Sequence, residues 1–251
     1  MIIPFLISYF KDKKRRNHII INNNKRKSKK LAPYVRDVYL SFLVKGARKT
    51  KYDGYPIIEK WMVATEIPKE IIQWNCRSTC SNQSESSISF YCTDQDFQCV
   101  LINPDKYLEI FSKYQSVIGM DASPFDNMPG IVQCSQIYVN LAFTYYLGRK
   151  GYKIIPNVRL GTKRTYSSLN AYPKGTLISI GTNGFIKSKL NRKIFSDQVR
   201  LIVDKLEPSG ILVYGPNIDE IFEYPREKGI PIYQYDSFIM LRNKELKNER
   251  S

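Results

Sequence analysis

Three acidic residues and one arginine have the types and positions that chemistry on a phosphate requires. Asp94, Asp96 and Asp121 follow or end short apolar runs, and Arg159 follows another. Carboxylates bind Mg²⁺ together with water and a substrate phosphate, so these acids are candidates for a site with Mg²⁺ as its cofactor. Arg159 is the candidate for a bidentate contact with the phosphate. Aspartates at such positions also cap helices by accepting backbone N–H bonds, and the sequence leaves this alternative open.

A short loop that begins and ends with glycine is the candidate phosphate-binding loop. Thr182, Asn183 and Gly184 lie between an apolar run and a helical pattern, where backbone N–H groups can face an anion. The loop is neither a Walker A motif nor a dinucleotide-binding fingerprint, because it lacks the residues that those motifs need. The alternative is a tight turn that requires a positive φ at Gly184.

The histidine and cysteine content disfavours several classes of chemistry. His18 is the only histidine, and it lies in a basic N-terminal stretch, so histidine general bases and Ser-His-Asp triads are disfavoured for the rest of the chain. Four of the five cysteines are clustered, but their second gap is too long for a typical structural zinc site. The odd number predicts free thiols in a reducing cytoplasm.

The elements that must position these residues form a repeat of strand, loop and helix from about residue 116 to 236. Five short, mostly apolar runs are predicted as buried parallel strands. They are residues 117–121, 153–158, 176–180, 210–214 and 230–235. Helical patterns at 129–151, 191–206 and 219–228 separate most of them. This alternation predicts parallel βαβ units, whose ligands bind at the carboxyl ends of the strands.

The predicted fold class is α/β, with repeated βα units and at least five parallel strands. An irregular or partial barrel is the first interpretation and an open doubly wound sheet is the alternative, because periodicity does not separate closed from open sheets. The predicted organisation comprises four ranges. They are a basic arm at 1–51, an extended connector at 52–88, the α/β domain at 89–240 and a charged tail at 241–251.

Segments of the repeat resemble a family known as domain of unknown function 4417, which occurs in bacteria, phages and mobile elements. The matching segments are Val-Ile-Gly-Met-Asp-Ala-Ser-Pro-Phe (117–125), Lys-Ile-Ile-Pro-Asn-Val-Arg (153–159), Ile-Ser-Ile-Gly-Thr-Asn-Gly (178–184) and Ile-Leu-Val-Tyr-Gly (211–215). Residues 90–97 are similar to the family's first strand. The sequence departs from the family at Leu160, where tryptophan is usual, and at Gln95, which separates two acids that are usually adjacent. The resemblance implies the fold and implies no chemistry.

The positive charge is concentrated at the N-terminus. Of the net charge of +16, residues 1–51 contribute +13, from 15 Lys or Arg against two acids, and the remaining residues contribute +3. Nine of these cations form two clusters. They are Lys13, Lys14, Arg15 and Arg16, and Lys25, Arg26, Lys27, Lys29 and Lys30. The clusters are predicted to bind nucleic-acid phosphates, with a solvated tail as the alternative.

Two functional hypotheses follow. In the first, a phage or plasmid protein associates with nucleic acid through its arm, in replication or maintenance. In the second, a small metal-assisted enzyme acts on a phosphate-bearing or nucleotide substrate at the strand ends. The sequence leaves open whether the chain is an enzyme, and it indicates no oligomeric state. It contains no run of about 18 apolar residues, so a cytoplasmic protein without a membrane partner is expected.

Overall fold

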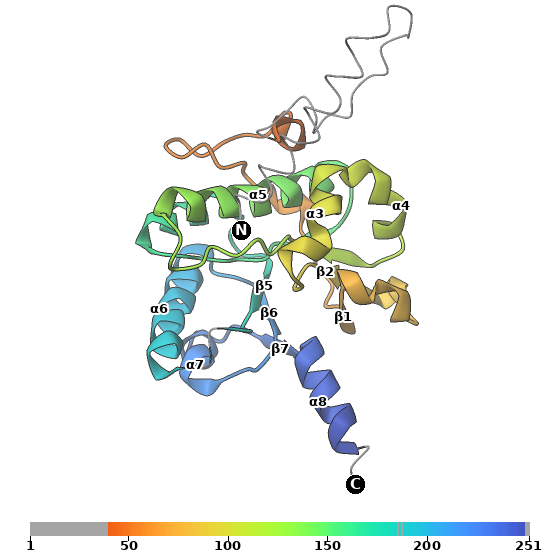
Figure 1. The fold of residues 1–251 in the computed structure, drawn as a ribbon. Coiled ribbons are helices and arrows are strands. Elements are labelled where there is room, and N and C mark those ends of the chain that lie inside the picture. The colour runs from red at the N-terminus through yellow and green to blue at the C-terminus, as the bar shows by residue number, and fades with distance from the viewer. Residues whose placement is uncertain (1–39, 185, 187, 249–251) are drawn as a thin grey trace, which may run out of the picture.

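The computed structural model describes residues 40–184, 186 and 188–248 (Figure 1). In this part of the chain, parallel strands form a four-stranded sheet of order β1-β2-β3-β4 and a three-stranded sheet of order β5-β6-β7. The strands are β1 (Glu70–Gln73), β2 (Ser86–Ser89), β3 (Ser116–Ile118), β4 (Ile154–Ile155), β5 (Leu177–Gly181), β6 (Gly210–Tyr214) and β7 (Ile232–Tyr235).

The two sheets meet between β4 and β5 without a regular ladder. An isolated parallel bridge pairs Asn157 with Ser179. The Val158 amide donates to the Ser179 carbonyl over 2.9 Å, and the Ser179 amide donates to the Pro156 carbonyl over 2.8 Å. Strand order therefore follows chain order through both sheets, as repeated βα units predict.

The predicted α/β class is confirmed, because each of the five predicted runs overlaps one of the strands β3 to β7. The predicted barrel is not found: within the described residues no ladder joins β7 to β1, and the strands form two sheets. Neither sheet reverses its strand order, so the arrangement also differs from a doubly wound sheet. The Tyr235 hydroxyl donates to the carbonyl of Pro68, just before β1, over 2.6 Å. A side-chain hydrogen bond thus links the end of β7 to the segment before β1, where a closed barrel would have a backbone ladder. Whether the outer strands pair depends on tertiary structure, which the periodicity of the sequence does not predict.

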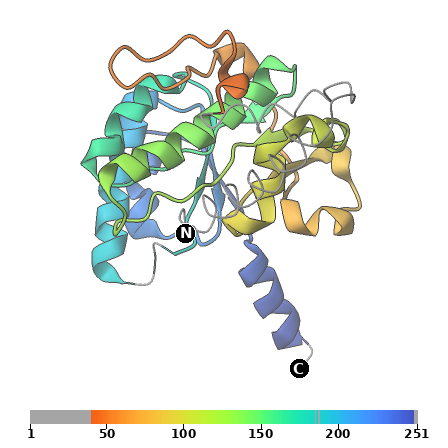
Figure 2. The same cartoon turned by 45° about the horizontal axis from the view of Figure 1, so that its top comes forward.

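Helices cover the sheets on several sides. The α-helices are α3 (Asp94–Ile102), α4 (Leu108–Phe111), α5 (Gly130–Arg149), α6 (Lys189–Leu206), α7 (Asp219–Glu227) and α8 (Phe238–Asn248). The 3₁₀ helices are η1 (Ser41–Val44), η2 (Lys60–Met62), η3 (Trp74–Thr79), η4 (Gln83–Glu85), η5 (Pro104–Tyr107) and η6 (Lys163–Ala171). Figure 1 shows α6 and α7 beside the three-stranded sheet and α3 and α4 beside the four-stranded sheet. In Figures 1 and 2, α8 extends away from the body.

Helix α6 forms where its apolar stripe predicts it. The hydroxyl of Ser188 accepts the Asn191 amide over 3.1 Å and so satisfies one of the first unpaired N–H groups of the helix. The predicted stripe is entirely buried. Its members are Phe195, Val199, Ile202 and Leu206. The stripe faces the interior, and Figure 1 shows α6 beside the three-stranded sheet.

Helix α5 is buried on all sides in its second half, residues 140–148. One reason is η1, which packs on it: the Phe42 ring meets the Tyr146 ring edge-on at 6.3 Å, and Leu43 is fully buried. The helix is followed by Gly151 at φ +93°, as the predicted helix end requires. Residues 41–44, which the sequence analysis places in the arm, therefore contribute to the core of the domain.

The range predicted as a connector, residues 52–88, contains β1 and most of β2. The described residues include no helix long and apolar enough to cross a membrane.

Candidate functional site

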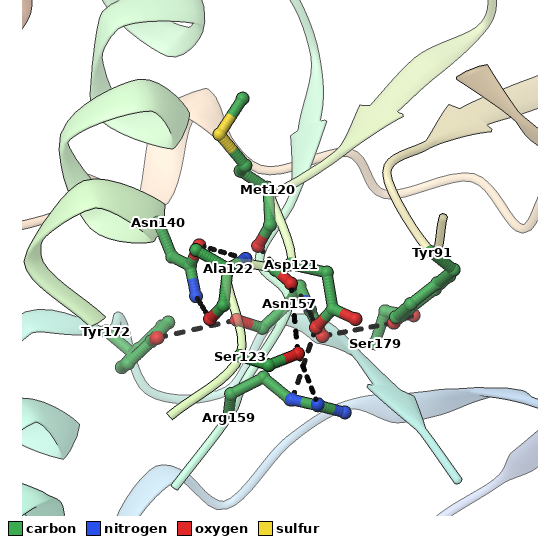
Figure 3. Close-up of polar contacts among 10 residues, drawn as sticks. All are labelled: Tyr91, Met120, Asp121, Ala122, Ser123, Asn140, Asn157, Arg159, Tyr172 and Ser179. Carbon is green, nitrogen blue, oxygen red and sulfur yellow. Dashed lines mark hydrogen bonds and ion pairs between the residues drawn. The ribbon is translucent and has the colours of Figure 1, made fainter. Parts of the chain in front are cut away.

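The polar residues predicted at the ends of β3 and β4 lie together where the two sheets meet (Figure 3). The two strands are parallel neighbours, with Val117 opposite Ile154 and Ile118 opposite Ile155. The residues that follow each strand are therefore also neighbours. This register brings Asp121 next to the segment that carries Arg159.

Asp121 and Arg159 form a buried ion pair. Arg159 Nε lies 3.2 Å from Asp121 Oδ1, and the side chains are 9% and 12% exposed, respectively. Asn157 Nδ2 donates to the same Oδ1 over 2.7 Å, and Arg159 Nη2 donates to Ser123 Oγ over 3.2 Å. Removing one partner of a buried pair leaves an uncompensated charge, so both side chains are strongly held in place.

Asn157 connects this pair to the second sheet. Its Oδ1 accepts the Tyr91 hydroxyl over 3.1 Å, and that hydroxyl lies 2.7 Å from Ser179 Oγ. The Tyr91 ring also stacks on the Tyr214 ring, with centroids 4.6 Å apart and an interplanar angle of 7°. No role was predicted for Tyr91 or Ser179 from the sequence. The available signal was a single serine inside the apolar run of β5.

The loop after β3 is fixed by Asn140 of α5. Asn140 Oδ1 accepts the Ala122 amide over 2.7 Å, and Nδ2 donates to the Ala122 carbonyl over 2.9 Å (Figure 3). Asn140 is buried, so these bonds are shielded from water. They fix the backbone between Asp121 and Ser123. Asn140 was not predicted from the sequence. The feature that could have indicated it is a polar residue at the start of the most apolar part of the helix.

A pocket of about 180 Å³ opens beside Arg159. Four segments line it: the β3–α5 loop, the residues after β4, the turn after β5 and the first turns of α6. The lining residues are Ser123, Pro124, Phe125, Asp126, Arg159, Asn183, Gly184, Asn191, Ile194 and Gln198. The structure thus brings Arg159 together with Asn183 and Gly184, three of the residues that the sequence analysis proposed for phosphate binding.

The turn after β5 has the conformation that its glycine predicts. Gly184 has φ +92°, which favours glycine. Thr182 is buried and does not line the pocket, because its amide and hydroxyl face the Tyr214 carbonyl at 3.1 and 3.4 Å. Gly215 has φ +115°, and a Cβ there would lie 2.5 Å from Thr182 Oγ1 and 3.1 Å from Asn183 Oδ1. A glycine at 215 therefore lets the end of β6 approach this turn.

The two aspartates of α3 have different environments. Asp96 completes a capping box, in which its Oδ2 accepts the Thr93 amide and hydroxyl over 3.2 and 2.9 Å. It therefore caps α3, as the alternative interpretation states. Asp94 is half-buried, and burial raises its pKa; the charge of Asp121 raises it further, and Arg159 opposes both. Asp94 is thus electrostatically coupled to the ion pair.

The pKa of Asp121 is also raised, because burial penalises its charged form. The charge of Arg159 and the hydrogen bond from Asn157 act in the opposite direction. A carboxyl group with a raised pKa exchanges its proton closer to neutral pH than an exposed aspartate does. Perturbed carboxyl groups beside a pocket are typical of functional sites, although ion-pair networks produce them too.

The residues expected to hold Mg²⁺ do not form a three-carboxylate site. Among the described residues, no group of three or more His, Cys, Asp or Glu side chains is arranged to hold a metal ion. Asp96 is engaged in its capping box, which leaves Asp94 and Asp121 as the coupled carboxylates.

The five cysteines are free thiols, as their odd number predicts.

The two basic clusters fall at residues 13–16 and 25–30, outside the described residues. Of the range predicted as the arm, the structure describes residues 40–51, where Lys45, Lys49 and Lys51 are exposed. Nucleic-acid binding by the arm therefore stays a prediction.

Comparison with known proteins relates the chain to phage proteins. It is 22% identical over 169 residues to the Gene 1 protein of Mycobacterium phage L5, covering 63% of this chain and 74% of that protein. It is 22% identical over 171 residues to the Gene 1 protein of Mycobacterium phage D29, covering 64% of this chain and 63% of that protein. The chain thus spans less than two thirds of the D29 protein. No solved structure matches.

The family match extends beyond the segments that carry the resemblance. The sequence profile described as Domain of unknown function (DUF4417) matches residues 51–236, a range that contains all the strands β1 to β7. The chain belongs to the DUF4417 family.

Proposed function

We propose that the α/β body binds a phosphate-bearing ligand at the carboxyl ends of its strands. One observation carries this proposal: Arg159, held by Asp121 and Ser123, lines the same pocket as Asn183 and Gly184. Ligands of parallel α/β folds bind outside the carboxyl ends of the strands, where this pocket lies.

The chemistry of the lining agrees with a phosphate group. A guanidinium presents a rigid, planar set of donors that matches phosphate oxygens. Backbone N–H groups of a turn with a positive φ also bind anions, and Gly184 has this conformation. The pocket, at about 180 Å³, is smaller than the roughly 300–1,000 Å³ typical of ligand sites. It therefore suits one small phosphate-bearing unit better than an extended cofactor.

The test is calorimetric titration of the full chain with ribose 5-phosphate, comparing Arg159→Lys with the unaltered protein. Lysine keeps the positive charge beside Asp121 but loses the planar donor set, so affinity should fall about tenfold or more. The matched control is Arg200→Lys, an exposed arginine of α6 that stacks on Tyr224 and does not line the pocket. Absence of binding to the unaltered protein, or equal affinity in Arg159→Lys, would overturn the proposal.

A second candidate function rests on a different observation, the concentration of +13 in residues 1–51. We propose that this arm binds nucleic-acid phosphates, and the similarity to phage proteins supports a role in a mobile element. If roughly six cations contact phosphates of duplex DNA, the slope of log affinity against log salt should be near −5.

Deleting residues 1–30, which removes both clusters, tests this candidate. Binding of a mixed-sequence DNA duplex should weaken strongly, and the salt slope should become much shallower. Unchanged affinity and slope would rule out the arm as the binding element. Metal-assisted catalysis has less support, because Asp96 caps α3 and the two coupled carboxylates, Asp94 and Asp121, do not line the pocket.

A further inference from the structure

The pocket beside Arg159 has an apolar wall that a phosphate group alone does not require. Phe125 and Ile194 both line it, and they are 47% and 44% exposed. They come from different segments, the β3–α5 loop and α6. An aromatic ring and an aliphatic side chain on one small pocket form a surface against which a flat ring can stack.

The polar part of the wall has two side chains that can accept hydrogen bonds, Gln198 and Asp126. Gln198 is buried, and its Nε2 donates to the Gly161 carbonyl over 2.9 Å. A carbonyl can only accept, so this bond settles the orientation of the amide and leaves Oε1 as the acceptor end of a pocket-lining side chain. Asp126 lines the same pocket with a carboxylate, which also accepts. These acceptors favour a ligand that carries N–H donors.

We propose, building on the phosphate site above, that the pocket binds one nucleotide unit whose base carries an exocyclic amino group. The base stacks on Phe125 beside Ile194, its amino group donates to Gln198 Oε1 or Asp126, and its phosphate contacts Arg159. Cytosine and adenine have such an amino group, and uracil has a carbonyl oxygen at the corresponding position. An acceptor left facing that oxygen discriminates against uracil, because a buried acceptor without a donor is costly.

The test compares three ligands by calorimetry on the full chain: cytidine 5′-monophosphate, uridine 5′-monophosphate and ribose 5-phosphate. The two nucleotides are almost identical in size, and the sugar phosphate lacks a base. We expect the cytidine nucleotide to bind at least about tenfold more tightly than ribose 5-phosphate, which is within the range of one base–aromatic stack. We expect a preference of about tenfold over the uridine nucleotide, whose base also stacks but leaves the acceptor without a donor. A ten-residue oligocytidylate distinguishes a free nucleotide from one within a strand, since tighter binding of the oligomer that Phe125→Ala weakens indicates a strand in the pocket, whereas binding through the basic arm does not depend on Phe125.

Two phenylalanine variants supply a matched pair. Phe125→Ala should weaken the cytidine nucleotide about tenfold and leave ribose 5-phosphate unchanged. Phe238→Ala on α8 removes a side chain of nearly equal exposure, 46%, that does not line the pocket, and should change neither affinity.

The outcomes separate this inference from the function on which it rests. Equal binding of all three ligands, or an unchanged cytidine affinity in Phe125→Ala, overturns base recognition and leaves the phosphate site standing. Tighter binding of the uridine nucleotide overturns the proposed role of the acceptors. Failure of all three ligands to bind overturns both proposals.

Discussion

Both sheets contain fully buried strands, and β2 of one sheet differs in residue type from β5 and β6 of the other. In the three-stranded sheet, β5 and β6 are mainly apolar, with Ile180, Leu212 and Val213 fully buried. In the four-stranded sheet, β2 has the sequence Ser-Ser-Ile-Ser, and each of its residues is buried. The apolar strands were predicted from the sequence, and β1 and β2 were not. The comparison shows that a parallel strand can be buried without an apolar pattern.

The serines of β2 are tolerated because their hydroxyl groups have partners. The hydroxyls of Ser87 and Ser116 bond to each other across β2 and β3. Ser89 Oγ donates to the Ile72 carbonyl over 3.2 Å, and Ser86 Oγ donates to the Asn82 carbonyl over 2.6 Å. Buried polar groups are nearly always hydrogen-bonded, and here the bonds run between neighbouring strands or to the adjacent loop. Strand β2 therefore depends on side-chain hydrogen bonds where β5 and β6 depend mainly on apolar packing.

The largest change in the free energy of unfolding is expected for the ion pair where the two sheets meet. Arg159→Met should lower the free energy of unfolding by about 3–5 kcal/mol, because it leaves the Asp121 carboxylate buried without its charged partner. Urea denaturation gives this value. Arg200→Met, at an exposed arginine, should cost less than about 1 kcal/mol. Equal costs in the two variants would show that the ion pair does not stabilise the junction.

Ser87→Ala tests the hydrogen-bonded sheet directly. It should cost about 1–3 kcal/mol, because the Ser116 hydroxyl loses its partner in a buried position. Ser87→Ala combined with Ser116→Ala should cost less than the sum of the single variants, since no hydroxyl is then left unsatisfied. Strict additivity in urea denaturation would contradict a hydrogen-bonded pair.

A smaller effect is expected for the helix cap near this sheet. Asp96→Ala should lower the free energy of unfolding by about 1 kcal/mol through loss of the capping box of α3. Ligand affinity should not change, since Asp96 does not line the pocket. A loss of ligand affinity without a loss of stability would indicate that Asp96 belongs to the ligand-binding site and is not only a helix cap.

Asp94 should produce the smallest effect, and one that depends on pH. Its pKa in the folded protein is raised, so the folded state binds the proton more tightly than the unfolded chain does. The stability from this proton is present at low pH and is lost as pH rises through the folded-state pKa. Asp94→Asn should therefore gain stability relative to the unaltered protein as pH rises from the acidic range, where an ordinary aspartate titrates, to neutral. Thermal unfolding across that range checks this, and a pH-independent difference would contradict it.

Part of the candidate site could be predicted because strand ends are local features. Asp121, Arg159 and Asn183 each follow an apolar run, and parallel pairing then brings such ends to one edge. Asn140, Tyr91 and Gln198 were missed because their partners are distant in sequence: Asn140 bonds Ala122, and Gln198 bonds Gly161. No local pattern indicates which backbone group a buried amide will meet.

The sequence by itself determined the α/β class, the five strands β3 to β7, the stripe of α6 and the positive φ of Gly184, because each follows from short-range periodicity or from the freedom of glycine. The tertiary structure decided that the strands divide into two sheets instead of closing, and that Asp96 caps a helix while Asp121 pairs with Arg159. Those outcomes depend on the pairing of segments far apart in the chain. The energy of a buried charge or hydroxyl is set by the partner that folding brings to it.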